Sequence, residues 1–136
     1  MTLAQPSLFR NWRHKRPPSA LERRTHIALA DLLRRAARPG WIWLHVPNGE
    51  MRSTATAALL KRMGVLAGAF DFLLIGPDGR HHWLELKRGR AALSDPQCEF
   101  LAQLQSRNIP HAVARSFDEA VACLKAWDVL KPLAVQ

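Results

Sequence analysis

Alternating apolar and polar stretches divide the chain into short segments separated by turn residues. Apolar residues spaced three or four positions apart predict helices, whereas short apolar runs bounded by Gly and Pro predict buried strands. The predicted helices run from Ser19 to just before Pro39, over roughly 53–63, over about 95–107 and from Ser116 to about Trp127. The predicted strands cover 41–46, 69–75, 80–87 and 111–114. In the first helix the apolar residues near one face are Leu21, Ile27, Ala28 and Leu32.

The order of these elements, α-β-α-β-β-α-β-α, indicates an α/β fold in which helices flank a mixed β-sheet. The chain has 136 residues, of which 48% are hydrophobic, enough for one core and unlike a disordered chain. We therefore expect a single domain over residues 19–130. A basic arm over residues 1–18, ending in Pro17-Pro18, precedes it.

Two acidic residues interrupt adjacent apolar strands: Asp71 lies in the strand before the turn 77–79, and Glu85 lies in the strand after it. Burying such a charge costs several kcal/mol of order unless it is compensated. Pro77-Asp78-Gly79 fits a three-residue hairpin loop, with Gly in the left-handed position. That loop would pair Gly76 with Arg80. Asp71 would then stand opposite Glu85 on one face of the sheet, and Lys87 would join that face.

Paired carboxylates predict a metal site. Two carboxylates at roughly 5 Å repel by about 3 kcal/mol at an effective dielectric constant of 20, so the fold gains nothing from them. A divalent cation such as Mg²⁺ reverses the sign of this interaction, and it prefers oxygen ligands. Such a cation can activate water against a phosphate, and Lys87 can stabilise the developing negative charge. Asp71, Glu85 and Lys87 together supply the parts of a phosphodiesterase.

Each of these residues also has a purely structural interpretation. Asp71 could cap a loop if the strand begins later than predicted. Glu85 and Lys87 could form an exposed ion pair on an edge strand, and taken alone that pair would favour this interpretation. The joint placement opposite Asp71, in a strongly basic chain, favours the catalytic site.

The charge balance indicates a polyanionic partner. Lys and Arg number 20 against 11 Asp and Glu, which gives a net charge of +9. Such a charge favours nucleic acid, because every phosphate that is neutralised releases a condensed counterion. A merely basic surface that aids solubility is the alternative, and acidic lipid is a further one. Besides the basic arm, the candidate phosphate-binding residues are Arg52, Lys61, Arg62, Arg88 and Arg90.

No apolar stretch approaches the roughly 20 residues that span a bilayer, so we expect no membrane partner. The basic N-terminus lacks the apolar region of a signal peptide. Cys98 and Cys123 lie on predicted helices without metal-ligand spacing, and we interpret them as buried free thiols of a cytoplasmic protein. A zinc site that joins them to His81 or His82 is a less favoured alternative.

Three further polar residues have two interpretations each. Gln97 begins the helix after the Glu85 strand, where its amide could orient a water or a phosphate, yet Ser94-x-x-Gln97 is also a good capping box. Glu22 has the same relation to Ser19. Glu50 follows a turn and could reach the metal region or be a solvated loop residue.

The ordered series of these motifs resembles the VRR-NUC family of PD-(D/E)xK nucleases. The resemblance covers about residues 20–115. It is carried by Val46-Pro47-Asn48-Gly49-Glu50, Gly64 through Gly68-Ala69-Phe70-Asp71, Leu84-Glu85-Leu86-Lys87, Leu93-Ser94 and Gln97.

The resemblance implies a restriction-endonuclease-like fold and a Mg²⁺- or Mn²⁺-dependent endonuclease that selects DNA by its structure. In this family the equivalents of Asp71 and Glu85 bind metal with the main-chain carbonyl of Leu86, and the equivalent of Lys87 is the catalytic lysine. Gln97 matches the family's glutamine and Glu22 its first-helix acidic residue. Small stand-alone members resemble Holliday junction resolvases. They can pair as homodimers, since two symmetric cuts in branched DNA need two active sites.

The chain departs from the family pattern at two positions. Phe70 stands where the superfamily name has Pro, at a position that is not a ligand. His26 stands where the first-helix pattern usually has Gln, four residues after Glu22. The alternatives to an endonuclease are a non-catalytic DNA-binding protein with a nuclease fold and an end-processing exonuclease.

Overall fold

The computed structural model of the chain describes residues 20–47 and 53–132. The elements in chain order are α1 (Ala20–Ala36), β1 (Ile42–His45), α2 (Thr54–Arg62), β2 (Phe72–Ile75), β3 (His81–Leu86), α3 (Asp95–Ser106), β4 (His111–Ala114) and α4 (Phe117–Ala126). The predicted order and the α/β class are confirmed. The basic arm and the predicted sites at Glu50 and Arg52 lie outside the described residues, as does the capping residue Ser19.

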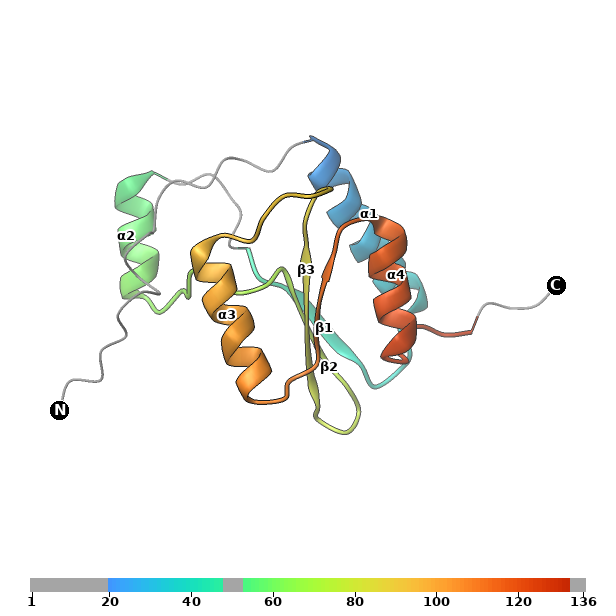
Figure 1. The fold of residues 1–136 in the computed structure, drawn as a ribbon. Helices are drawn as coiled ribbons and strands as arrows, with labels where there is room; N and C mark the ends of the chain where they lie inside the picture. Colours follow the sequence, from blue (N-terminus) through green and yellow to red (C-terminus); the bar gives the residue numbers. More distant parts are fainter. Residues whose placement is uncertain (1–19, 48–52, 133–136) are drawn as a thin grey trace.

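The four strands form one mixed sheet in the order β1-β2-β3-β4. Strands β1 and β3 run antiparallel to β2, which lies between them, and β4 runs parallel to β3. Helices α1 and α4 cover one face of this sheet, and α3 covers the other (Figure 1). The sheet therefore lies between two layers of helices, although most side chains of the edge strand β1 are exposed.

A separate core fills each side of the sheet. On the α1/α4 side, Leu29 and Leu33 of α1 and Leu124 of α4 pack against strand residues such as Phe72 and Leu84. On the α3 side the buried residues are Ala69, Phe70, Phe100 and Leu104, with Trp83 and Val113 packed against them.

The face of α1 that packs against the core differs from the one predicted. Leu29 and Leu33 are buried, whereas Leu21 and Ile27 are 49% and 52% exposed. Apolar residues lie on more than one side of this helix. Their spacing alone therefore does not predict which side packs against the sheet and α4. Among the described residues, no helix combines the length and apolar character needed to cross a membrane.

The hairpin between β2 and β3 has the predicted register. The Gly76 amide donates to the Arg80 carbonyl at 3.0 Å, and the Gly79 amide donates to the Gly76 carbonyl at 2.8 Å. Gly79 has a φ of +80°, the left-handed conformation expected of the last loop residue. Phe72 pairs with Leu84, which places Asp71 and Glu85 one step further along the same ladder.

Two details of the predictions are wrong. The second strand begins at Phe72 rather than residue 69, because the Asp71 amide donates to the Glu85 side chain instead of a strand carbonyl. Cys98 is exposed and Cys123 is half-buried, so the cysteines are free but not fully buried. On α3 the buried positions are Pro96, Gln97, Phe100 and Leu104, and Cys98 lies off that face.

Candidate active site

The loop-to-strand junction at Asp71 interlocks with the end of β3. The Asp71 amide donates to Glu85 Oε2 at 3.1 Å, and the Leu86 amide donates to Asp71 Oδ2 at 2.8 Å. Each carboxylate is thus held by the main chain of the opposite strand. The predicted juxtaposition of Asp71 and Glu85 is present, and Leu86 adjoins Asp71 through its main-chain amide.

Gln97 links this pair to the start of α3. Its Nε2 donates to Glu85 Oε1 at 2.9 Å, and its Oε1 accepts from the Ser94 amide at 2.9 Å. Ser94 Oγ in turn accepts from the Gln97 amide, which completes a capping box. The two interpretations of Gln97 are therefore compatible, because one end of the amide caps the helix and the other contacts Glu85.

Glu85 and Gln97 are each 3% exposed. Charge-assisted hydrogen bonds from N–H groups compensate part of the cost of burying a carboxylate. Because Oε2 accepts from the Asp71 amide and Oε1 from Gln97 Nε2, Glu85 is held in a single orientation beside Asp71. The result is a rigid, oxygen-rich site rather than an exposed ion pair.

Gly68 allows the Asp71 loop to reach α3. A Cβ at this position would lie 2.3 Å from the Pro96 carbonyl carbon and 2.7 Å from the Gln97 nitrogen, and φ is +82°. Only glycine permits both this approach and this backbone conformation without strain. The glycine lets the segment before Asp71 pack directly against the first turn that carries Gln97.

Lys87 follows β3 and is half-buried, two residues beyond Glu85. Its amide donates to the Ala114 carbonyl at 2.9 Å, which continues the parallel ladder with β4. This ladder supports the prediction, made from strand alternation, that the Lys87 side chain lies on the same side as Glu85.

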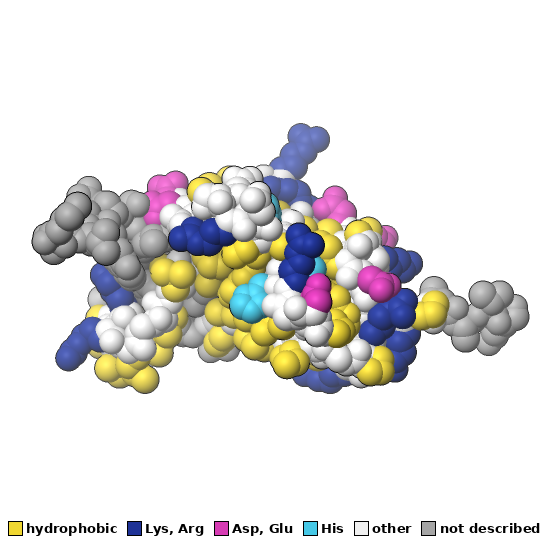
Figure 2. Space-filling model, turned by 90° about the horizontal axis from the view of Figure 1, so that it is seen from below, with side chains coloured by type: hydrophobic (Ala, Val, Ile, Leu, Met, Phe, Trp, Pro, Cys, Tyr) yellow, Lys and Arg dark blue, Asp and Glu magenta, His cyan; other side chains and the backbone are white. Residues whose placement is uncertain are grey.

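The remaining predicted residues lie on the surface. Glu22 is exposed in the first turn of α1, one turn before His26. Lys61 and Arg62 are exposed in the last turn of α2, and Arg88 and Arg90 are exposed in the loop after β3. The opposite, hairpin end of the sheet shows Lys and Arg side chains scattered among hydrophobic ones (Figure 2). Net charge alone therefore does not locate a nucleic-acid interface.

Arg115, which no motif in the sequence marks, holds the loop after Lys87. Its Nη1 donates to the Gly89 and Ala91 carbonyls at 3.1 and 2.6 Å. These bonds connect the loop that carries Arg88 and Arg90 to the end of β4. No sequence signal marks this role, because Arg115 lies 24 residues or more from its partners.

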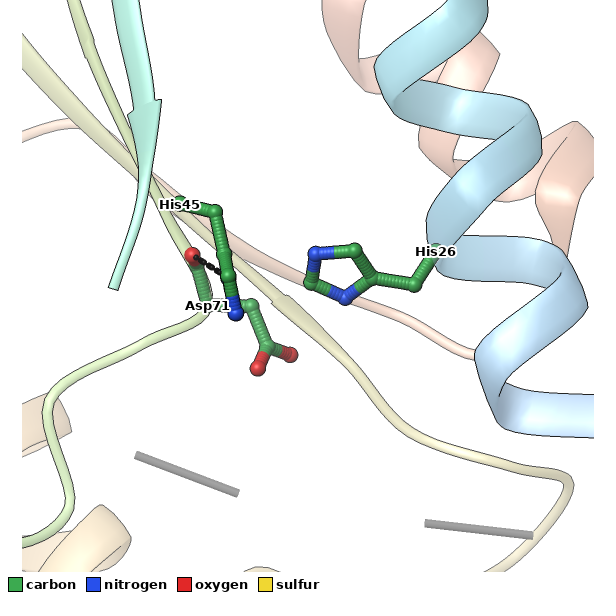
Figure 3. Close-up of side chains that lie close together, drawn as sticks. All are labelled: His26, His45 and Asp71. Atoms are coloured by element: carbon green, nitrogen blue, oxygen red, sulfur yellow. Dashed lines mark hydrogen bonds between the residues drawn. The ribbon is translucent and has the colours of Figure 1, made fainter. Parts of the chain in front are cut away.

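A second unanticipated feature adjoins Asp71 on its α1 side. The ligand atoms of His26, His45 and Asp71 all lie within 4.8 Å of one another. His45 Nδ1 donates to the Asp71 carbonyl oxygen at 2.8 Å, and the two imidazole rings meet edge to face with centroids 4.1 Å apart. Figure 3 shows both rings and the carboxylate turned toward a common space.

Burial lowers the pKa of His26, and the neighbouring His45 lowers it further, whereas the Asp71 carboxylate opposes this shift. The His26 ring is therefore neutral at neutral pH and keeps a nitrogen lone pair. In the sequence, His26 was noted only as a departure from a motif. Its position four residues after Glu22, on the same side of the helix, was the available signal.

No protein-family model and no curated protein sequence matches this chain. Its structure is similar to a solved structure described as a VRR_NUC domain protein, with a TM-score of 0.65 and 22% sequence identity. The similarity covers 81% of this chain and 89% of that one. The resemblance found in the sequence is thus confirmed at the level of architecture: this chain has the fold of a VRR_NUC domain protein.

Proposed function

We propose that this protein is a metal-dependent endonuclease of the VRR-NUC kind that hydrolyses phosphodiester bonds in DNA. The observation that carries the proposal is the interlocked pair Asp71 and Glu85, braced by Gln97. A structural role does not require two carboxylates at this position, because their mutual repulsion opposes folding. A metal-dependent reaction on a phosphodiester gives the pair a purpose, because two carboxylates can hold the cation.

Mg²⁺ or Mn²⁺ fits this donor set. Asp71 and Glu85 supply carboxylate oxygens, and Leu86 would add its main-chain carbonyl. All three are hard oxygen ligands of the kind these cations prefer. The hydrogen bonds that main-chain amides donate to these two carboxylates leave other oxygen lone pairs on each carboxylate. Those lone pairs can coordinate a cation. When bound, the cation would polarise a phosphate and lower the pKa of a water molecule.

Each protein group then has a defined task. Lys87, on the same side as Glu85, would stabilise the negative charge that develops on the phosphate. Gln97 would act as a positioning residue, because its amide holds Glu85. Glu22, which matches the family's first-helix acidic residue, would add an acidic side chain to the site from α1, the helix that also carries His26.

The substrate we propose is branched DNA, such as a Holliday junction or a flap, cut in the cytoplasm by a homodimer. The net charge of +9 supports a DNA partner. Arg88 and Arg90 lie within three residues of Lys87, so they would contact phosphates beside the reacting one. Lys61, Arg62 and Arg52 would hold flanking DNA. The preference for branched DNA and the dimer rest on the family resemblance.

The test is cleavage of labelled four-way junction, flap, duplex and single-stranded DNA with Mg²⁺ or Mn²⁺, comparing wild type with Glu85→Ala. Cutting that disappears with EDTA and in the variant is the expected result. Tight binding without cutting, under both metals and with a dimer established by light scattering, would instead indicate a non-catalytic DNA-binding protein. Circular and linear substrates separate an endonuclease from an end-processing exonuclease.

A further inference from the structure

We propose that His26, His45 and Asp71 form a binding site for a divalent transition-metal cation, such as Mn²⁺ or Co²⁺, next to the carboxylate pair. The three ligands come from α1, from the end of β1 and from the loop before β2. Their ligand atoms lie within 4.8 Å of one another. Two imidazoles and one carboxylate suit Co²⁺, and Mn²⁺ accepts imidazole nitrogen as well as oxygen ligands, whereas Mg²⁺ prefers oxygen alone.

The tautomer of His45 supports this role. A carbonyl oxygen can only accept, so the 2.8 Å contact with the Asp71 carbonyl requires the proton of the ring to reside on Nδ1. In the neutral ring, Nε2 then carries the lone pair. A histidine ligand whose other nitrogen donates to a main-chain carbonyl is a common arrangement at metal sites. The same bond fixes the ring beside Asp71.

His26 is also held in place from outside the cluster. Its ring stacks on Phe72 with centroids 4.6 Å apart, and Phe72 is fully buried in the sheet. The α1 helix is anchored to the sheet through Leu29 and Leu33. His26 is therefore presented to Asp71 by a rigid element, and little ordering remains to be done when a cation binds.

Asp71 belongs to both groups. Its Oδ2 accepts the Leu86 amide at 2.8 Å, on the side of the carboxylate pair. Two ligand atoms about 2.1 Å from one cation lie at most about 4.2 Å apart, so the ligand atoms must draw together from a spacing of up to 4.8 Å. The exposed His45 side chain can make that adjustment. One carboxylate shared by two cation positions recurs in phosphodiester-cleaving sites with paired metals.

Binding of this cation does not depend on the proposed nuclease activity, and it is tested without DNA. Untagged, metal-free full-length protein is loaded with Mn²⁺, and nitrogen coordination is read by pulsed electron paramagnetic resonance. Co²⁺ affinity is measured by visible absorption. The variants are His26→Gln, His45→Gln and, as a matched control, His81→Gln, which replaces an exposed histidine at the hairpin.

Wild type and His81→Gln are expected to show nitrogen couplings to Mn²⁺. His26→Gln and His45→Gln should each lose a coupling and bind Co²⁺ at least about tenfold more weakly. Because His26 packs on Phe72, circular dichroism checks that its variant folds, and the exposed His45 provides a second test. Absence of nitrogen couplings in wild type, or Co²⁺ affinity within twofold of wild type in both variants, overturns the proposal.

Glu85→Gln separates this proposal from the nuclease proposal. The histidine site retains its nitrogen couplings in that variant even though the carboxylate pair is lost. If the couplings vanish there, the histidines do not form a site of their own. If the couplings persist but no DNA is cut by wild type, the metal site stands and the nuclease proposal fails.

Discussion

The Asp71 main-chain amide donates to Glu85 Oε2 at 3.1 Å, so the residue just before β2 is hydrogen-bonded to a side chain of β3 instead of to its backbone. The two acidic side chains are thereby brought together by the hairpin itself, through a turn whose chemistry sets the register. A cation that relieves their repulsion should measurably raise the free energy of unfolding.

Divalent metal should therefore raise the melting temperature of the wild-type protein, and EDTA should reverse the increase. A cation at 100 times its dissociation constant adds about 2.7 kcal/mol to the free energy of unfolding if it binds only the folded chain. Glu85→Gln should lose most of this Mg²⁺-dependent increase, as measured by differential scanning calorimetry. Asp31→Asn, on the exposed side of α1, should keep all of it. Equal stabilisation of both variants would exclude Glu85 as a ligand.

Ser94 and Gln97 share a capping box but differ in their contact with Glu85. Ser94→Ala removes one capping bond and should lower the free energy of unfolding by about 1 kcal/mol while cleavage persists. Gln97→Ala should lower stability and also lower the cleavage rate by at least about tenfold, because it frees the Glu85 carboxylate. Denaturant unfolding and single-turnover cleavage measure the two effects. Parallel losses of rate in both variants would mean that Gln97 acts only through the helix.

Gly68 and Gly64 allow a matched comparison of backbone strain and steric clash. Both have positive φ, at +82° and +100°, but a Cβ at Gly64 meets nothing within 4 Å. Gly64→Ala should cost about 1 kcal/mol, from the left-handed backbone alone. Gly68→Ala should cost about 2 kcal/mol more, because its Cβ overlaps the Pro96 carbonyl. Urea unfolding measures both, and equal losses would contradict the close approach.

Local chemistry explains why much of the fold was predictable. The sequence Pro77-Asp78-Gly79 specifies a loop length, the loop specifies the register, and the register aligns Asp71 with Glu85. In the same way, Ser94 and Gln97 mark the start of α3 through hydrogen bonds between two residues only three positions apart in the sequence. Signals of this kind are complete within a short window of sequence.

The unpredicted features depend on contacts between distant segments. The buried face of α1 is determined by its packing against the sheet and α4. Spacing alone therefore could not predict that Ile27 is exposed and that His26 packs on Phe72. The histidine cluster needs α1 to cross the ends of β1 and β2 at one particular position. Likewise, the late start of β2 follows from a bond between Asp71 and a residue 14 positions away.

His82 should make the fold sensitive to acid. It is 7% exposed, lies between the Trp41 and Trp127 rings, and donates from Nδ1 to the Arg80 carbonyl. Burial lowers the pKa of His82 below its ordinary value of 6.5, with the charge of Arg80 adding to the shift and Asp78 opposing it. The unfolded chain thus binds the proton more readily, and stability falls as the pH drops below 6.5.

The measurement is the free energy of unfolding between neutral and mildly acidic pH, from urea titrations. His82→Phe keeps an aromatic ring between the two tryptophans and should flatten the acid-side loss of stability. His81→Phe, at the exposed neighbouring position, should leave the slope as in wild type. A slope unchanged by His82→Phe would assign the acid sensitivity to other groups.

The cationic side chains of α2 should hold DNA at a distance from the reacting phosphate. Lys61 and Arg62 are exposed in the last turn of a helix that lies beyond α3, away from the sheet (Figure 1). Each phosphate contact that is lost reduces the slope of log affinity against log salt concentration by about 0.9. Lys61→Ala and Arg62→Ala should therefore weaken binding and flatten that slope, as measured by fluorescence anisotropy over a series of salt concentrations.

Arg107→Ala is the matched control, because it removes one positive charge from the C-terminal end of α3, the end opposite Gln97. If long-range attraction by the net charge were the only effect, all three variants would weaken binding to the same small extent. A flatter slope in the α2 variants, with Arg107→Ala unchanged, assigns direct phosphate contacts to Lys61 and Arg62. An unchanged slope in both α2 variants removes this helix from the interface and leaves the loop of Arg88 and Arg90 to hold the DNA.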